Sequence, residues 1–341
     1  MGSTEPTGIP VVDFSSFSAG SDSDRRLIAN KIDRAFSTTG FLYLKNHGIT
    51  ARKVNEAFQW NKRFFALGEA LETAVPRQHH RGYGASGREQ VRGQLCLKAN
   101  FDIGDLDDDL NVWPQDHLLP GFRNVMEDFY KDCILVIRDV LTALTLALDL
   151  PLSTSPLLTQ VTSDFVLSLL HYPSVPSATF QDGSSRRFPA HSDTGLLTLL
   201  FQDGIGGLQI AKPGSASDDK SATLDREGHW IDVPPRPGCA ILNVGYLLHR
   251  WSNGRWKAGV HRVVEPPVST DAEEIDRDMA PERFSIPFFA APNPDTTLEA
   301  LPGCYGEDTP KKWKPLLAGA YRAKKRDEVY VKVSSGQSPL P

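Results

Sequence analysis

Three stretches in the first 150 residues carry apolar side chains at helical spacing, which predicts three amphipathic helices. They cover residues 22–40, 51–67 and 125–150. The first ends at Gly40, a residue type that commonly stops a helix. Its apolar face is made of Leu27, Ile28, Ile32, Ala35 and Phe36. The third stretch is strongly apolar in its second half, so we expect it to be the central helix.

After Pro151 the pattern changes to short β-type runs separated by turn residues. The runs are, in order, DFVLSLLHY, LLTLLFQ, GLQIA, HWIDV, CAILNV, GVHRVVE and RFSIPFF. Such spacing is typical of an antiparallel sandwich or barrel. The polar stretch 212–228 is interpreted as a surface insertion between two strands.

The N-terminal half adds extended runs at residues 9–17 and 41–48, and a polar, glycine-rich stretch at 76–100 that we expect to be a surface loop. The pattern therefore predicts an α+β protein whose two parts form one compact unit. Residues 1–120 form a helical and strand region that caps a barrel core of residues 121–341. The tail 311–332 is compatible with a helix over the barrel, and we expect its charged run to be solvated.

Composition narrows the class of protein. The 341 residues are 40% hydrophobic, which is ordinary for a folded chain, and the net charge of -5 gives no electrostatic reason to expect nucleic acid or an anionic membrane as partner. No apolar run reaches 18 residues, and no secretory leader is evident at the start. The four cysteines are widely spaced and are read as free thiols in a reducing, cytoplasmic setting.

Candidate chemistry begins in RRFPAHSDTGLLTLLFQD, residues 186–203. His191 and Asp193 stand two apart in a β-type run, so both side chains point to the same face. A histidine and an aspartate at this spacing are a weak signal alone, because a hydrogen-bonded pair in a strand is the ordinary alternative. A third ligand would turn the pair into a metal site.

His261, on a β-type run after a glycine turn, is the preferred third ligand. His249 is an alternative, but it lies in a segment with helical character, and His171 is interpreted as a packing residue. Two imidazoles and one carboxylate on one side of a metal form the facial triad of non-haem Fe(II) sites, which leaves positions open for substrate and dioxygen.

A second candidate lies in ERFSIPFF, residues 282–289. On a strand, Arg283, Ser285, Pro287 and Phe289 share one face. A guanidinium beside a hydroxyl makes a good clamp for a carboxylate. The alternative for this arginine is a surface charge on an edge strand.

Taken in order, these motifs resemble the isopenicillin N synthase-like family of Fe(II)- and 2-oxoglutarate-dependent oxygenases. The resemblance covers nearly the whole chain. It rests on IPVVDFSSF (9–17), GFLYLKNHGI (40–49), RGYGASGRE (81–89), FDIG (101–104), HYP (171–173), HSDTGLLTLLFQD (191–203), GGLQI (206–210), SNGRWKAGVHRVV (252–264) and RFSIPFF (283–289).

The resemblance implies a distorted jelly-roll barrel, the double-stranded β-helix, with N-terminal helices and a long central helix packed outside. It implies that His191, Asp193 and His261 bind Fe(II) and are the catalytic residues. It also implies that Arg283 and Ser285, joined by Tyr172, hold 2-oxoglutarate. Many members carry an asparagine two positions before that tyrosine, where this chain has Leu170, which puts one cosubstrate contact in doubt. The gap between Asp193 and His261 is long for the family, and the insertion at 212–228 accounts for it.

The implied reaction is the oxidation of a small specialised metabolite by dioxygen, as hydroxylation, desaturation or ring rearrangement, with release of succinate and CO2. Ascorbate is the expected reductant in vitro. Two enzyme alternatives are an oxidase like isopenicillin N synthase, which uses no 2-oxoglutarate, and an ascorbate-dependent oxidase of the ethylene-forming type. A non-catalytic small-molecule-binding relative is the alternative from another class.

Residues near the substrate are harder to predict than the metal ligands. Phe289 is expected to form an apolar wall for the substrate. Four further candidate pocket residues lie nearer the N-terminus: Arg92, Gln94, Leu95 and Phe101. Arg92 is a candidate partner for a substrate carboxylate or phenolate, with a solvated loop arginine as its alternative. The sequence leaves the oligomeric state and the substrate's identity open.

Overall fold

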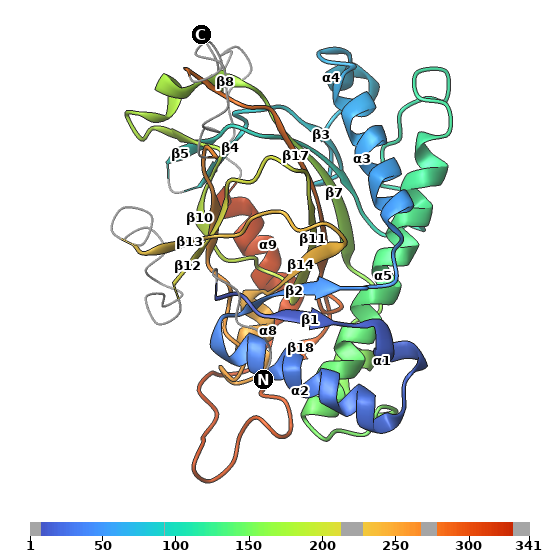
Figure 1. Ribbon diagram of the computed structural model, residues 1–341, viewed down its shortest axis with the longest axis vertical. Helices are drawn as coiled ribbons and strands as arrows, with labels where there is room; N and C mark the ends of the chain where they lie inside the picture. Colours follow the sequence, from blue (N-terminus) through green and yellow to red (C-terminus); the bar gives the residue numbers. More distant parts are fainter. Residues whose placement is uncertain (1–7, 92, 213–227, 267–277, 330–341) are drawn as a thin grey trace.

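Two facing β-sheets form the centre of the computed structural model, which describes residues 8–91, 93–212, 228–266 and 278–329 (Figure 1). The larger sheet has eight strands, in spatial order β1 (Val11–Asp13), β2 (Phe41–Lys45), β14 (Cys239–Val244), β11 (Leu197–Gln202), β17 (Arg283–Ala290), β7 (Phe165–Tyr172), β6 (Ala99–Ile103) and β3 (Gly82–Gly84). The smaller sheet has the order β10 (Phe188–His191), β15 (His261–Val263), β12 (Leu208–Ala211) and β13 (Trp230–Asp232). This is the predicted jelly-roll barrel.

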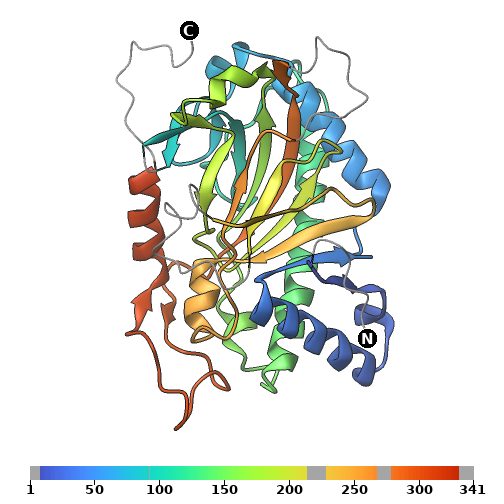
Figure 2. The ribbon, with the colours of Figure 1, turned by 60° about the vertical axis from the view of Figure 1, so that its left-hand side comes forward.

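Helices cover the outer face of the larger sheet (Figure 1). The helices of the first half are α1 (Ser15–Ala19), α2 (Asp22–Thr38), α3 (Ala51–Phe65), α4 (Ala70–Ala74) and the long α5 (Phe122–Ala147). The part of the chain after Pro151 adds α6 (Pro156–Thr159), α8 (Tyr246–Trp251) and α9 (Ala318–Val329). Figure 2 shows α9 along one side of the barrel and α3 along the other.

Smaller elements complete the ends of the barrel. A three-stranded sheet joins β4 (Glu89–Val91), β5 (Gln94–Cys96) and β9 (Ser185–Arg186). Two short pairs consist of β8 (Val175–Pro176) with β16 (Met279–Ala280) and of β18 (Thr297–Leu298) with β19 (Leu316–Leu317). A single 3₁₀ turn, η1 (Ser177–Phe180), follows β8.

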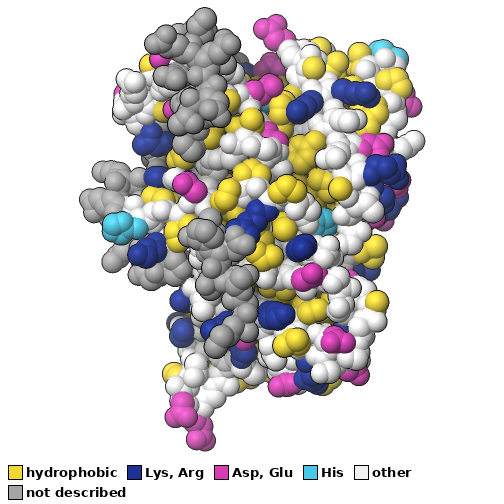
Figure 3. Space-filling view, viewed as in Figure 1, with side chains coloured by type: hydrophobic (Ala, Val, Ile, Leu, Met, Phe, Trp, Pro, Cys, Tyr) yellow, Lys and Arg dark blue, Asp and Glu magenta, His cyan; other side chains and the backbone are white. Residues whose placement is uncertain are grey.

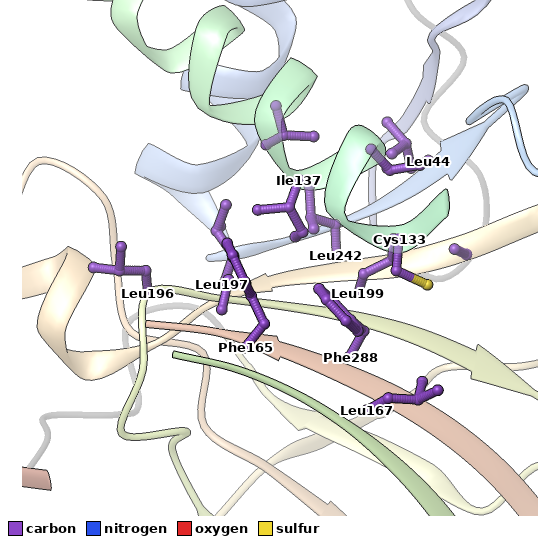
Figure 4. Packing of buried hydrophobic residues seen from close by; sticks show 14 of the residues in the cluster. Leu44, Cys133, Ile137, Phe165, Leu167, Leu196, Leu197, Leu199, Leu242 and Phe288 are labelled. Atoms are coloured by element: carbon purple, nitrogen blue, oxygen red, sulfur yellow. The ribbon is translucent and has the colours of Figure 1, made fainter. Parts of the chain in front are cut away.

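Side-chain alternation along the strands separates a hydrophobic core from the barrel interior. On β17, Ile286 and Phe288 pack under the helices, whereas Phe289 lines a cavity inside the barrel. Figure 4 shows the core on the helical side, where Cys133 and Ile137 of α5 meet residues of several strands. Because alternate side chains point to opposite faces, this one strand supplies residues to both the core and the cavity.

The predicted helices agree with α2, α3 and α5 to within a few residues. Both ends of α2 follow from local chemistry: Ser21 and Asp24 form a reciprocal capping box at its start, and Gly40, with φ of 76°, follows its end. The long helix begins at Phe122, three residues before the predicted start. Its burial against the sheet confirms its central place.

The expectation of a surface loop at 76–100 is wrong, because this stretch contains β3, β4, β5 and the start of β6. Cys96, Leu97 and Lys98 in it are buried. Several of its polar residues, among them Glu89, Lys98 and Asn100, line the barrel cavity, which is why polarity alone misled. The insertion at 212–228 lies outside the described residues except at its two ends.

The tail forms helix α9 as expected, but its charged run is not wholly solvated. The Arg322 side chain is only 12% exposed, and both Arg322 and Arg326 line the cavity. The division of the chain at residue 120 stays a prediction. Strands from both parts belong to the larger sheet.

Among the described helices, none combines the length and the apolarity that crossing a membrane requires. Basic and acidic side chains are interspersed on the face shown in Figure 3. This mixture matches the modest net charge of the chain.

Neighbouring phenylalanines on β17 allow a test of the alternation. Phe288 is fully buried against Phe165 and Tyr130, so Phe288→Ala should lower the free energy of unfolding by about 3–5 kcal/mol. Phe289→Ala, at a half-buried cavity position, is the matched control and should cost clearly less. Denaturant titration measures both, and equal losses would contradict the assignment of the two faces.

Candidate metal centre and cavity

The smaller sheet brings the two predicted histidines together. Strands β10 and β15 are antiparallel, with His191 directly opposite His261, and Asp193 follows two residues after His191. The Nε2 atoms of His191 and His261 lie 3.7 and 3.9 Å from Oδ1 of Asp193. Within the described parts of the chain, these three residues form the one cluster of histidine, cysteine or carboxylate side chains that can hold a metal, with their ligand atoms within 4.8 Å of one another.

Backbone carbonyls orient both imidazole rings. Nδ1 of His191 lies 2.8 Å from the carbonyl oxygen of Pro189, and Nδ1 of His261 lies 3.0 Å from that of Gly259. A carbonyl only accepts hydrogen bonds, so each Nδ1 carries the proton and donates it. Each Nε2 then presents a lone pair to the cluster, as a metal ligand must.

The larger sheet holds the carboxylate. Oδ2 of Asp193 accepts hydrogen bonds from Oγ1 of Thr198 at 2.5 Å and from Nδ2 of Asn243 at 2.8 Å. Thr198 on β11 and Asn243 on β14 are cross-strand partners. The two donors occupy Oδ2 and leave Oδ1 facing the imidazoles. The larger sheet therefore orients the carboxylate, and the smaller sheet positions the two histidines.

Burial and charge set the protonation of the cluster. Burial, reinforced by the neighbouring His261, lowers the pKa of His191 to about 3, so its imidazole is neutral at physiological pH. Burial by itself would raise the pKa of Asp193, but the two histidines and the bonds from Thr198 and Asn243 lower it on balance. A neutral imidazole beside an ionised carboxylate is the form in which these groups bind a divalent metal.

The alternative third ligand, His249, lies elsewhere. It is part of α8, its Nδ1 is 2.7 Å from the carbonyl oxygen of Trp256, and its ring contacts Trp313. His171 points to the outside of the barrel, where it stacks on Phe284 and lies 2.7 Å from Glu282. Neither belongs to the metal-binding cluster.

Arg283, Ser285 and Tyr172 come together inside the barrel. Arg283 is 1% exposed, and its Nη1 donates to Oγ of Ser285 at 3.2 Å. Its other bonds go to the carbonyl oxygen of Gly206 and to Oε1 of Gln202. The guanidinium carbon lies 4.8 Å from the centre of the Tyr172 ring. Every one of these acceptors is neutral, so the buried cation has room for a carboxylate partner.

A second buried arginine stands beside this group. Arg187 is 1% exposed, donates to the carbonyl oxygen of Pro281, and has Nε and Nη1 without a hydrogen-bond partner. Burial and the charge of Arg283 lower its pKa to about 10. Sequence reasoning did not single it out. The local signal was its place four residues before His191 on the strand run that carries the cluster.

A cavity of about 660 Å³ opens onto the cluster, and His191 and Asp193 are part of its wall. This volume is in the range of sites for small organic ligands. Phe289 lines it, together with Leu170, Val166 and Phe188. The cavity therefore has an apolar wall beside the candidate metal centre.

Three of the other predicted substrate residues, Phe101, Gln94 and Leu95, are not among the lining residues. Phe101 is fully buried in the core, where it packs on Phe64 and Phe122. Gln94 donates to the carbonyl oxygen of Gly183, and Leu95 is also not among the lining residues. Arg92 falls outside the described residues.

The polar wall was missed by sequence reasoning. Asn100 and Asp102 alternate with Phe101 on β6, so the interior face of that strand is the one opposite to Phe101. Lys98 and Glu89 form an ion pair of 2.6 Å that is also part of the wall, and their side chains are 5% and 8% exposed. The polar–apolar alternation in ANFDI was the signal that could have found the first two.

Comparison with known proteins supports the geometry. A family model described as the N-terminal region of a non-haem dioxygenase in morphine synthesis matches residues 9–116, and that of the 2OG-Fe(II) oxygenase superfamily matches residues 163–292. A 2-oxoglutarate-dependent dioxygenase of Aspergillus rugulosus is 30% identical, with 94% of this chain and 98% of that protein covered. A proline hydroxylase of Petromyces alliaceus is 33% identical, with 85% and 89% covered.

Among solved structures, full-length T7H of Neurospora crassa in complex with alpha-KG is similar with a TM-score of 0.80. The two sequences are 33% identical, and the likeness covers 93% of this chain and 95% of the other. The same protein has been solved with alpha-KG and thymine, at a TM-score of 0.78 and 31% identity.

Removing a bond that holds the carboxylate tests the construction of the cluster. Asn243→Ala should weaken Fe(II) binding roughly 10–100-fold, because Asp193 loses a donor that fixes its orientation. Anaerobic Fe(II) titration measures the change. Asn124→Ala, at an exposed position of α5, is the control and should bind Fe(II) like the wild type. Unchanged affinity in Asn243→Ala would show that this bond does not organise the site.

Proposed function

The chain belongs to the 2-oxoglutarate- and Fe(II)-dependent oxygenase superfamily, and from this premise we propose that His191, Asp193 and His261 hold the iron of a dioxygenase that oxidises a small organic metabolite. We further propose that Arg283, Ser285 and Tyr172 hold 2-oxoglutarate. The observation that carries the proposal is the clustering of two Nε2 lone pairs and one carboxylate oxygen within 4.8 Å at the wall of a cavity.

The donor set fits Fe(II). Two imidazole nitrogens and one carboxylate oxygen are the ligands of the facial triad, and they approach from one side. The ring of each histidine is fixed through Nδ1, and Asp193 is fixed through Oδ2. The ligands are therefore preorganised before a metal binds, which favours affinity and a defined geometry.

The clamp fits 2-oxoglutarate. Its carboxylate would neutralise the buried guanidinium of Arg283, which otherwise has only neutral acceptors. The hydroxyl of Ser285 adds a donor beside it. Leu170, two positions before Tyr172, is apolar and lines the cavity, so the Arg–Ser pair bears the polar recognition of the carboxylate in this proposal.

Fe(II) and 2-oxoglutarate, when bound, supply the chemistry that reduces dioxygen, converts 2-oxoglutarate to succinate and CO2, and oxidises a C–H bond of the substrate. The residues of the chain would bind and orient these groups and enclose the substrate. Phe289, Phe188 and Val166 give the substrate an apolar surface beside the metal ligands and displace water from it. Thr198 and Asn243 keep the Asp193 carboxylate ionised and in place.

A small substrate agrees with the size of the cavity. One relative is named as a proline hydroxylase, and the similar T7H of Neurospora crassa has been solved with thymine. Both names refer to small organic compounds, which supports a small substrate here. We therefore propose a specialised metabolite of low molecular mass, with hydroxylation as the default outcome and desaturation or ring rearrangement as variants of the same oxidation.

Succinate formation tests the proposal. Wild-type protein with Fe(II), ascorbate, oxygen and 2-oxoglutarate should release succinate slowly without substrate, and His191→Ala should abolish this because one of three ligands is lost. Metal binding measured in parallel separates the alternatives. Iron binding without succinate would favour an oxidase independent of 2-oxoglutarate, and no iron binding would favour a non-catalytic binding protein.

A conservative change tests the clamp separately. Arg283→Lys keeps the charge but loses the planar fork, so the KM for 2-oxoglutarate should rise about tenfold or more. Steady-state succinate formation at varied 2-oxoglutarate measures it, and Arg34→Lys on the exposed face of α2 is the matched control. An unchanged KM would exclude Arg283 as the cosubstrate's partner.

A further inference from the structure

We propose that Arg81, Arg322 and Arg326 form an anion site at the outer part of the cavity and bind a carboxylate of the substrate. The substrate is then an organic acid whose apolar part reaches toward the metal ligands. This inference rests on the proposed function and names the class of compound that the same cavity accepts.

The last described helix brings two of the three arginines into the cavity. Arg322 and Arg326 lie four residues apart on α9 and therefore on one face of it, and both line the cavity. Arg81 lines it from a tight turn before β3, in which its backbone N–H donates to the carbonyl oxygen of Gln78. Figure 2 shows α9 beside the barrel. Tyr321 on the same helix also lines the cavity.

Positive charge exceeds negative charge in this wall. The described lining residues include seven lysines and arginines, against three carboxylates besides that of Asp193. Those three are already engaged: Asp102 by Arg77 at 2.8 Å, Glu89 by Lys98 at 2.6 Å and Glu328 by Lys325 at 2.7 Å. The cavity itself therefore offers no spare anion to the three arginines.

Partners from outside the cavity neutralise the arginines only in part. Arg322 pairs with Asp164, and Arg81 approaches Asp108 at 3.7 Å. In the part of the chain that the structure describes, the side chain of Arg326 makes no ion pair or hydrogen bond, and Nε of both Arg81 and Arg326 is buried without an acceptor. Burial and the charges of Arg326 and Arg81 lower the pKa of Arg322 to about 10, so the three guanidiniums repel one another. A bound anion would remove that repulsion.

The backbone fixes the position of Arg81. Its guanidinium lies against Gly104 so closely that a Cβ at residue 104 would come within 2.0 Å of Nε. A glycine is needed there for the arginine to occupy its place. A guanidinium held in this way loses little conformational entropy on binding a carboxylate, which favours a bidentate contact.

The apolar wall of the cavity determines the chemical character of the rest of the ligand. Phe188, Leu170 and Phe289 form the apolar wall near His191. Arg283, the proposed partner of 2-oxoglutarate, is not among the described lining residues, so the two acids have separate cations. A compound with a carboxylate at one end and an apolar body at the other fits both walls.

A matched acid and amide test the inference. Calorimetry under anaerobic conditions, with the protein loaded with Fe(II) and saturating 2-oxoglutarate, would compare 4-phenylbutyrate with 4-phenylbutyramide. We expect the acid to bind at least tenfold more tightly to the wild type. Arg326→Gln should lose this preference, and Arg326→Lys should keep part of it. Arg34→Gln, the same change at an exposed position of α2, should bind like the wild type.

Two results would overturn the inference: equal affinities of acid and amide for the wild type, including no binding of either, or an acid preference that Arg326→Gln retains. Succinate formation without substrate separates this failure from failure of the proposed function. The wild type and Arg34→Gln should both form succinate even if the acid and the amide bind alike, because the proposed metal and 2-oxoglutarate residues are distinct from the three arginines. Loss of succinate from the wild type itself would count against the proposed function.

Discussion

The two-residue alternation of side chains across the larger sheet is the constraint on which both core and site depend. One face must bury apolar side chains under α3 and α5, because that contact is the main hydrophobic core. The opposite face of the same strands is then committed to the barrel interior. A register slip of one residue would exchange the two faces, turn Arg283, Ser285 and Phe289 away from the barrel interior and bring Phe288 into it.

The candidate metal centre depends on both sheets at once. The smaller sheet contributes His191 and His261 as cross-strand neighbours. The larger sheet contributes Thr198 and Asn243, which donate hydrogen bonds to Oδ2 of Asp193 and leave Oδ1 for the metal. The carboxylate lies in the segment that passes from one sheet to the other, so the distance between the sheets fixes the shape of the ligand set. A barrel with rigid walls suits a site that must stay open toward substrate.

Local patterns were enough to predict the helices and an antiparallel sandwich or barrel, and the order of the motifs pointed to the jelly roll and to His191, Asp193, His261 and Arg283 as candidate site residues. These features depend on spacing within one segment or on the order of motifs. The bonds from Thr198 and Asn243 could not be predicted, because they arise from the register between β11 and β14. Phe101 was misplaced for a related reason: the short strand β6 follows a glycine-rich stretch, and its phase is set by pairing with β7.

The position of α9 in the chain has an evolutionary consequence. The proposed iron and 2-oxoglutarate residues all lie between Tyr172 and Ser285, whereas Arg322 and Arg326 belong to the last described helix. A terminal helix can be altered, lengthened or exchanged without disturbing the strands that precede it. Descendants of such a fold can therefore acquire new substrates by changing the C-terminal segment while the oxidising machinery is inherited intact.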